Sequence, residues 1–516
     1  MKKLSWLLFT MILMLMIAGC SSNEASNNGS STSNDEDKET QEGGVLNVAI
    51  SSEPPTLDVH INGSSVLKDV GRNIYENLVT FDESGNIVPD LAESFEVSED
   101  GLTYSFKLRE GIKFHNGKEL TADDVVASLN RWIKLSSPGK TNFQGSEFVK
   151  VDDYNVELHI PSPNINTPAL LADPIPAAAI YPKEVVESAE DTGVKEYIGT
   201  GPFKLKEWKQ NQSITVERFE DYSSEGRGIA KEPKLDEIVF SFITDESTRI
   251  SGLSTGQFHV SNISSDNVQQ IEGLPDVSTE LSPGGFMGLF YNNLEGISTD
   301  LNFRKAVNAA LNMDDILIAS YGNPEFYELT SSIVNPQYPN YYSEAGKEEY
   351  NQNDPEKAKE YLAQSNYNGE EIILLTSRDN QDQYNSAVVI QQQLEAIGIK
   401  TKLEVYDWAT FQEKWADPAA WDILTVAWAS RSTIFQGFWG SDGQPVEESV
   451  KYLDKIKAAP SVEEARTAID ETQSYVWDQL PFTVLGHRKQ VNAISNKIAG
   501  YQYNLGPVYY NISLTK

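Results

Sequence analysis

The sequence predicts an α/β protein, and three observations support this expectation. Strand-like segments alternate with amphipathic helical segments along most of the chain. The clearest unit lies between residues 371 and 405, where a buried strand, an amphipathic helix and a second strand follow one another. Such a βαβ crossover is right-handed and builds a mostly parallel sheet, with ligands at the carboxyl ends of its strands. A chain of 516 residues is also long enough for two or three lobes with separate cores.

The first 19 residues have the pattern of a secretory signal peptide. A positively charged start is followed by a nearly uninterrupted apolar run to Ile17 and then by two small residues. Residues 17–20, Ile-Ala-Gly-Cys, also resemble the bacterial lipobox, which implies cleavage before Cys20 and attachment of a diacylglycerol to its thiol. The alternative is a plain signal peptide with an incidental cysteine. We expect an extracytoplasmic protein held to the cell membrane by lipid on Cys20, as on a Gram-positive cell surface.

A flexible tether is expected next, over residues 20–44. Ser, Asn, Asp, Glu and Gly dominate this stretch, and it has too few apolar residues to bury a core. The fold is expected to begin with residues 45–50, which read as a buried strand. Cys20 is the only cysteine in the sequence, so no disulfide can form within the chain.

The formal net charge of −35 limits the classes of partner. Such a surface repels nucleic acid and anionic lipid headgroups, and it favours a soluble monomer. It does not identify the ligand, because a pocket can have the opposite sign from the surface around it.

Several further elements can be predicted in chain order. Residues 104–108 and 156–160 alternate as half-buried strands, and the second is ended by Pro161. Thr121 to Asp124 form a capping-box variant at the start of a helix. The apolar face of that helix comprises Val125, Val126, Leu129, Trp132 and Ile133. Asp354 and Pro355 are typical of another helix start.

The unit between 371 and 405 can be divided more finely. Residues 372–375 are the first strand, and residues 386–397 are the helix. Gly398 ends that helix, and residues 399–405 are the second strand.

One short motif suggests a hydrolase. Residues 252–256 match the G-x-S-x-G nucleophile elbow, which requires a strand before the serine and a helix after it. Here the order is reversed, because residues 245–255 read as a helix that Gly256 ends. We therefore interpret Ser254 as a helical residue and do not expect an enzyme.

No cofactor or metal site is expected. The five histidines are scattered, without the i, i+3 or i, i+4 spacing of protein metal sites. Phosphate-binding and dinucleotide-binding glycine motifs are absent from the sequence.

Several stretches closely resemble the peptide/nickel/opine-binding family of ABC-transporter solute receptors. The most specific is the long run over residues 87–125, which contains Leu-Thr-Ala-Asp-Asp-Val near its end. The other matching segments keep the order and approximate spacing of the family: residues 199–204, 207–209, 218–222, 303–311 and 354–358. The resemblance implies a non-enzymatic receptor that binds a solute and docks on membrane permease subunits.

The resemblance also implies a two-lobe periplasmic-binding-protein-like fold of class II, of the large type with a subdomain inserted in lobe one. The expected boundaries are 45–284 for lobe I, 285–480 for lobe II and 481–516 for the return to lobe I. The inserted subdomain is expected at roughly residues 75–195. The two chain crossings are placed near residues 282–285 and 480–481.

Similarity to dipeptide-binding members suggests where the ligand is held. Arg378 follows a strand at the position of an arginine that grips the terminal carboxylate of a peptide; the alternative is a surface or interlobe salt bridge. After Trp428, those members carry an aspartate that pairs with the amine of the peptide, whereas this sequence has Arg431 and no acid before Asp442. The remaining ligand candidates are Trp428, Trp439, Asn62 and Ser64.

The absence of that aspartate bears on the substrate. Loss of the amine anchor and gain of a cation favour a peptide-like solute that is acidic or has a blocked amine. Alternatives are an oligosaccharide, an opine or a metal chelate, and a receptor that only reports to a sensor also stays open.

Overall fold

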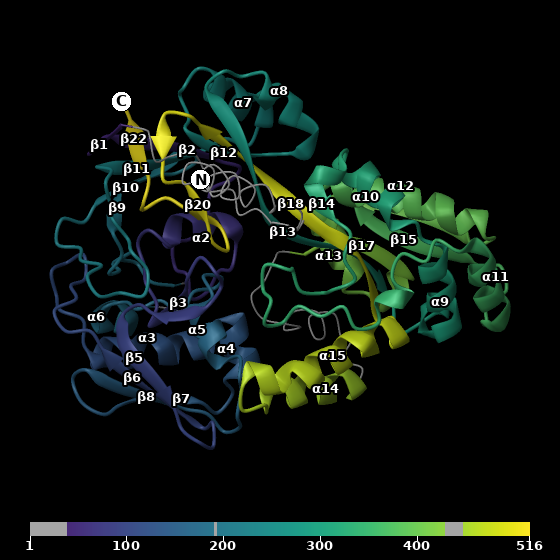
Figure 1. Ribbon diagram of the computed structural model, residues 1–516, viewed down its shortest axis with the longest axis horizontal. Helices are drawn as coiled ribbons and strands as arrows, with labels where there is room; N and C mark the ends of the chain where they lie inside the picture. The colour runs from purple at the N-terminus through teal and green to yellow at the C-terminus, as the bar shows by residue number, and fades with distance from the viewer. Residues whose placement is uncertain (1–38, 190–192, 429–446) are drawn as a thin grey trace, which may run out of the picture. The chain divides into compact units, whose positions relative to one another are not determined.

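The computed structural model describes residues 39–189, 193–428 and 447–516 (Figure 1). Its largest element is an eleven-stranded sheet, with the order β16-β15-β17-β13-β18-β12-β2-β11-β10-β9 and β14 paired to β18. The strands are β2 Val45–Ile50, β9 Phe203–Lys209, β10 Ser213–Arg218, β11 Glu237–Phe242, β12 Val260–Ile263, β13 Val277–Tyr291, β14 Tyr327–Glu328, β15 Glu371–Ser377, β16 Lys400–Tyr406, β17 Ile423–Ala427 and β18 Phe482–Ser495. The predicted α/β class is confirmed.

The sheet is mixed, so the expectation of a mostly parallel sheet is wrong for the sheet as a whole. Parallel pairing joins β16, β15 and β17 at one end, and β11, β2 and β12 further along. Antiparallel pairing joins β17 to β13, β13 to β18 and β18 to β12. The two parallel groups are thus separated by one long antiparallel pair, which pattern reading of single segments cannot reveal.

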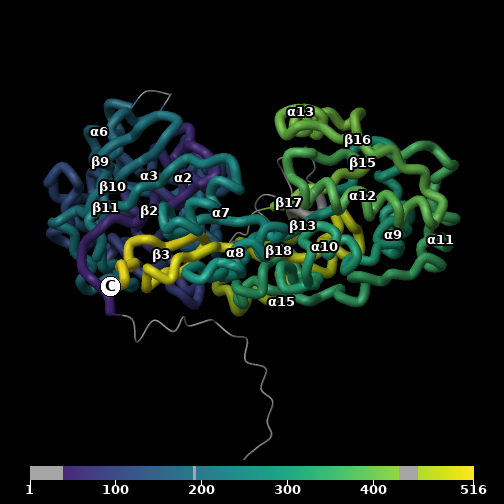
Figure 2. The backbone as a smooth tube through the Cα atoms, turned by 90° about the horizontal axis from the view of Figure 1, so that it is seen from above, coloured from purple at the N-terminus to yellow at the C-terminus, as the bar shows by residue number. Residues whose placement is uncertain are grey.

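That long pair, β13 with β18, connects different cores of the molecule (Figure 2). The register shifts between Pro283 and Phe286, so one part of β13 pairs with residues 489–495 and the other with residues 482–487. Val277 packs in a small core with Ile250 and Phe258, whereas residues 286–291 belong to the largest core. The predicted crossing near residues 282–285 falls at this shift, and the lobe boundaries themselves remain predictions.

A third core lies against a separate four-stranded sheet of order β5-β6-β8-β7. Its strands are β5 Ala92–Val97, β6 Thr103–Leu108, β7 Glu147–Lys150 and β8 Asn155–His159. Helix α3, Ala122–Leu135, packs into this core through Val125, Leu129 and Trp132. The predicted strands at 104–108 and 156–160 are confirmed, with β8 shifted by one residue.

The remaining helices connect the strands. They are α2 Ser65–Gly71, α4 Ser137–Asn142, α5 Thr167–Ala172, α6 Lys183–Glu187, α7 Glu246–Ser254, α8 Val268–Glu272, α9 Leu301–Ala310, α10 Met313–Tyr321, α11 Pro355–Gln364, α12 Gln381–Ala396, α13 Trp408–Trp415, α14 Glu447–Lys457 and α15 Val462–Gln479. Asp354 caps α11 as predicted, because its carboxylate accepts from the backbone N–H of Lys357. Gly398 follows α12 with φ +95°, as its predicted role as a stop requires. Helix α12 begins at Gln381, five residues before the predicted start at Ser386.

Regular structure is present before the expected first strand at Val45. Strand β1, Thr40–Gln41, pairs with the C-terminal strand β22, Ser513–Thr515, which also pairs with β19, Ile498–Ala499. The backbone N–H of Gly43 donates to the carbonyl of Lys234. The end of the predicted tether is therefore part of the fold, because main-chain pairing with the distant C-terminus holds it despite its polar composition. Within the described part of the chain, no helix combines the length and apolar character that a membrane span requires.

Candidate functional site

Arg378 lies directly after β15, at the carboxyl end of the parallel strands. Its backbone N–H donates to the carbonyl of Tyr406 at 2.8 Å, and its Nη2 donates to the carbonyl of Val405 at 2.8 Å. The side chain is exposed, and no carboxylate of the described residues forms an ion pair with it. The alternative for Arg378, a surface or interlobe salt bridge, is thus not formed within the described ranges. Most of its guanidinium N–H groups remain open to a ligand.

Trp428 comes to the same edge from the neighbouring strand. It follows β17, and its backbone N–H donates to the carbonyl of Phe286 at 2.8 Å. The hydroxyl of Thr425 on β17 donates to that of Thr376 on β15 at 3.0 Å, which fixes the two strand ends side by side. The structure therefore brings Arg378 and Trp428 together at one edge of the sheet.

An aromatic cluster surrounds this edge, and sequence reasoning missed most of it. The rings of Trp415 and Trp428 lie 6.0 Å apart, and those of Phe411 and Trp415 lie 5.8 Å apart. Trp408 stacks on Phe411 at 5.2 Å, and the ring of Trp428 also contacts Phe290 at 6.0 Å. All three tryptophans are half-buried, so each combines packing with an exposed face.

The signal for Trp408 was present in the sequence. Asp407 caps α13 directly after β16, and Trp408 is the first residue of that helix. Its backbone N–H donates to the Asp379 carboxylate at 2.7 Å. A strand end followed at once by a helix cap places the first helical side chain at the same edge as Arg378, and this pattern could have identified Trp408.

Asn62 and Ser64 lie elsewhere in the sheet order, in the loop between β2 and α2. Four strands separate β2 from β15. The Asn62 amide oxygen accepts from the backbone N–H of Ser64 at 2.8 Å, and the Ser64 hydroxyl accepts from that of Leu67 at 3.4 Å. Both side chains thus order the loop and cap α2 while remaining half-buried. The other candidates, Arg431, Trp439 and Cys20, lie outside the described residues.

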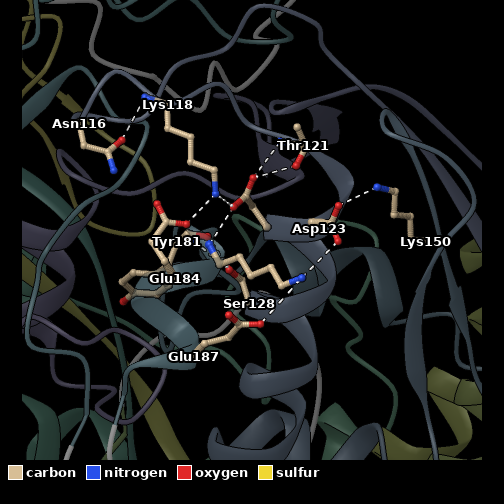
Figure 3. Close-up of polar contacts among 11 residues, drawn as sticks. Asn116, Lys118, Thr121, Asp123, Ser128, Lys150, Tyr181, Glu184 and Glu187 are labelled. Carbon is tan, nitrogen blue, oxygen red and sulfur yellow. Dashed lines mark hydrogen bonds and ion pairs between the residues drawn. The ribbon is translucent and has the colours of Figure 1, made fainter.

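The most specific part of the sequence resemblance has a structural role. The Asp124 carboxylate is fully buried and accepts from Lys118 Nζ at 2.6 Å, the Thr121 backbone N–H at 3.0 Å and the Lys183 backbone N–H at 2.7 Å. Figure 3 shows the same Lys118 side chain pointing toward Glu184, its second partner at 2.7 Å. The predicted capping box is confirmed, and it joins the start of α3 to the start of α6.

The hydrolase motif is not a nucleophile elbow. Ser254 is the last residue of α7, and its hydroxyl donates to the carbonyl of Ser251 at 2.7 Å. Gly256 follows with φ +72°, and a side chain at Gly252 would meet the ring of Phe258 at 2.3 Å. The predicted helix with a glycine stop is confirmed.

We therefore expect Ser254→Ala to leave solute binding unchanged, and an active-serine phosphonate probe to leave the parent protein unlabelled. Labelling is measured by mass spectrometry after incubation with the probe. Covalent modification that disappears in Ser254→Ala would contradict this interpretation.

Two further histidines, the half-buried His115 and the buried His487, serve packing. Burial lowers the pKa of His115 and of His487 to about 4, although each ring bonds a backbone carbonyl, those of Gly201 and Ser332. Within the described residues, no group of three or more His, Cys, Asp or Glu side chains is arranged to hold a metal ion.

Comparison with known proteins decides the family. The family model for bacterial extracellular solute-binding proteins, family 5 (middle), matches residues 86–444. This chain belongs to that family. The family 5 chain is 28% identical to the oligopeptide-binding protein AppA of Bacillus subtilis (strain 168), over 97% of this chain and 96% of the relative. It is 26% identical to the dipeptide-binding protein of Escherichia coli (strain K12), over 83% and 86% of the two chains.

Solved structures agree with this assignment. The family 5 fold superposes on AgaA in complex with agropinic acid, from A. tumefacien R10, with a TM-score of 0.77 at 27% identity, over 92% of this chain and 99% of that one. For B. subtilis AppA in complex with a nonapeptide the TM-score is 0.75 at 26% identity, over 93% and 100%. The predicted two-lobe α/β fold is confirmed, and the chain is a solute-binding receptor of the ABC-importer type.

Proposed function

We propose that this family 5 receptor binds a peptide-like solute through an acidic group and delivers it to ABC permease subunits. The observation that supports this most is the exposed guanidinium of Arg378 at the carboxyl end of β15, without a carboxylate partner among the described residues. A planar guanidinium fork is suited to a carboxylate, and ligands of open α/β sheets bind outside the carboxyl ends of the strands.

The aromatic cluster adds a second requirement for the solute. The half-buried rings of Trp408, Trp415 and Trp428 lie at the same edge as Arg378 and can cover a flat or apolar body. A solute with a carboxylate next to such a body satisfies both features. Capture proceeds by closure, because a solute that contacts both lobes only in the closed state shifts the population toward it.

A second candidate is an opine. AgaA, 27% identical to this chain, was solved with agropinic acid, whereas AppA, 26% identical, was solved with a nonapeptide. An arginine beside aromatic rings suits an opine acid as well as a peptide carboxylate.

Calorimetric titration with three forms of one dipeptide tests the preferred ligand chemistry: Ala-Glu, N-acetyl-Ala-Glu and Ala-Glu with an amidated C-terminus. We expect acetylation to change the affinity by less than about threefold, because no amine anchor is proposed. Amidation should weaken binding by about 30-fold or more, because it removes a desolvated carboxylate. Strict dependence on the free amine would overturn the proposal. Mass spectrometry of solute released from the purified protein by mild unfolding distinguishes a peptide from an opine.

We further propose that the mature protein is a monomer anchored by a lipid on Cys20. The support is the apolar N-terminal run that ends in Ile-Ala-Gly-Cys, followed by a polar tether. A single cysteine at that position has an obvious chemical use in an exported chain, and the anchor would keep the receptor close to its permease.

Replacing Cys20 with serine should release the protein from membranes into the medium without changing solute affinity, since Cys20 precedes the first strand, β1, which begins at Thr40. Membrane fractionation and calorimetry of Cys20→Ser measure the two effects. A substitution in the same tether that spares the thiol, Ser26→Ala, is the control and should stay with the membrane. Retention of Cys20→Ser on membranes would contradict lipid anchoring.

A further inference from the structure

A buried carboxylate, that of Asp58, stabilises the loop that carries Asn62 and Ser64. Asp58 is fully buried, and its oxygens accept from the backbone N–H groups of His60 at 3.1 Å and Val194 at 3.0 Å. The same carboxylate pairs with the guanidinium of Arg131, with Nη2 at 2.5 Å and Nη1 at 3.1 Å. This two-pronged geometry is the strongest that a carboxylate and an arginine form.

His60 extends this contact along the loop. Burial lowers the pKa of His60 to about 4, against the opposing effect of Asp58, so the ring is neutral at physiological pH. Its Nε2 lies 2.8 Å from the carbonyl of Ala179, which requires an N–H there, and its Nδ1 accepts from Arg131 Nη1 at 3.0 Å. Arg131 therefore touches two loop residues at once, Asp58 and His60.

Tyr181 completes the support. Its hydroxyl accepts from the backbone N–H of Val59 at 3.1 Å, and its ring meets that of His60 edge to face at 4.9 Å. The Ser128 hydroxyl on α3 donates to the Tyr181 carbonyl at 3.0 Å. Every loop residue from Asp58 to His60 is thus bonded to side chains or carbonyls from outside the loop.

Arg131 comes from a different core than the loop. It lies on α3, whose neighbouring residues Leu129 and Trp132 belong to the core of the four-stranded sheet, whereas Val59 belongs to the core around β2. The Arg131 side chain is only 8% exposed, and no described acid other than Asp58 forms an ion pair with it. Burial of this ion pair is costly, because two charges must be taken out of water. A contact at the surface would avoid that cost.

We propose that Arg131 is a positioning residue for solute binding, which sets the conformation of residues 61–64 through its fork on Asp58 and His60. The loop then presents Asn62 and Ser64 in one geometry, fixed by a side chain from α3. This inference rests on the solute-binding role that the family resemblance implies for Asn62 and Ser64.

Amide hydrogen exchange provides a test that needs no ligand. In Arg131→Gln, the amides of residues 59–67 should exchange at least about tenfold faster than in the parent, as expected when one partner of a local network is lost. Amides of β15 and β16 should not change. Arg131→Lys keeps the charge but not the fork, and we expect an intermediate effect. Arg218→Gln removes an arginine paired at the surface with Asp236 and Glu220, and serves as the control.

Binding of N-acetyl-Ala-Glu provides the functional test. We expect Arg131→Gln to weaken binding about tenfold at a temperature far below its melting point, and Asn62→Ala to weaken it less in that background than in the parent. A merely structural role would lower the melting temperature and leave the Asn62→Ala effect additive. Unchanged loop exchange, or additive binding effects, would overturn the inference. If the parent does not bind the peptide while loop exchange responds as expected, the proposed ligand chemistry fails and the positioning of the loop stands.

Discussion

Replacing Glu76 with glutamine should destabilise the protein by about 3–5 kcal/mol, because it leaves two buried cations with one buried anion. Glu76 and Asp90 are 0% and 2% exposed at their side chains, and Arg227 and Lys231 are 1% and 6% exposed. Arg227 Nη1 lies 2.6 Å from Glu76 and 3.0 Å from Asp90, and Lys231 Nζ lies 2.8 Å and 2.7 Å from them.

The four residues Glu76, Asp90, Arg227 and Lys231 form a buried quartet. Few neutral hydrogen-bonding groups nearby could compensate for the charge lost in Glu76→Gln. The Tyr222 hydroxyl donates to Glu76 at 2.8 Å and the Thr200 hydroxyl at 2.9 Å, so both lose a charged acceptor as well. Urea unfolding measures the free energy of unfolding. The matched control is Glu93→Gln, which removes a half-exposed ion pair with Lys107 and should destabilise the protein far less than Glu76→Gln. Equal costs for the two variants would contradict the assigned importance of the quartet.

The same quartet predicts acid sensitivity. Burial alone would raise the pKa of Glu76, but Arg227 and Lys231 outweigh it and lower the pKa to about 2. The folded state therefore binds fewer protons than the unfolded state between the ordinary carboxyl pKa and about 2. This contribution to stability is fully present above about pH 5 and is lost as the pH falls through that window. The stability of Glu76→Gln should depend less on pH there than that of the parent.

Truncation of Arg378 should cost about 2–5 kcal/mol of solute affinity, roughly 30- to several-thousand-fold, if it holds a desolvated carboxylate. Loss of an arginine at the rim of the site would cost well under 1 kcal/mol, which is less than about a fivefold change in solute affinity. Arg378 is exposed, and among the described residues its side chain donates only to the carbonyl of Val405, so its removal should scarcely change the melting temperature. This separates an effect on binding from one on folding.

Arg431→Ala is the companion variant, since we predict a second cationic anchor after Trp428. Titration of N-acetyl-Ala-Glu against Arg378→Ala, Arg431→Ala and the control Arg466→Ala measures all three, since Arg466 on α15 is a half-exposed arginine paired with Asp470. If Arg378→Ala and Arg431→Ala both bind within about threefold of the parent, the acidic-ligand hypothesis is wrong. Stacking on the tryptophans would then be the better explanation, and Trp408→Ala should produce the larger loss.

Local patterns predicted the elements well because their causes lie within a few residues. Alternation identified β6 and β8, and the Asp-Pro start and the glycine stop marked α11 and α12. The rejection of Ser254 as a nucleophile likewise needed only the order of helix and glycine. Part of the candidate site followed from the same logic, since Arg378 and Trp428 each follow a strand.

What the sequence could not indicate depends on segments far apart in the chain. The mixed sheet arises from the long pairing of β13 with β18, and the inclusion of Thr40 and Gln41 in the fold arises from their pairing with β22. The buried quartet joins Glu76 and Asp90 to residues about 140 to 155 positions away, where the sequence showed only ordinary charges.

By itself, then, the sequence determined the α/β class, the receptor family, the main element boundaries and the strand-end position of Arg378, because periodicity, caps and family motifs are local. Only the tertiary structure decided which charges are buried and what supports the candidate loop. The Arg131 fork on Asp58 and His60 spans 73 and 71 positions, and its strength comes from exclusion of water, which no local pattern records.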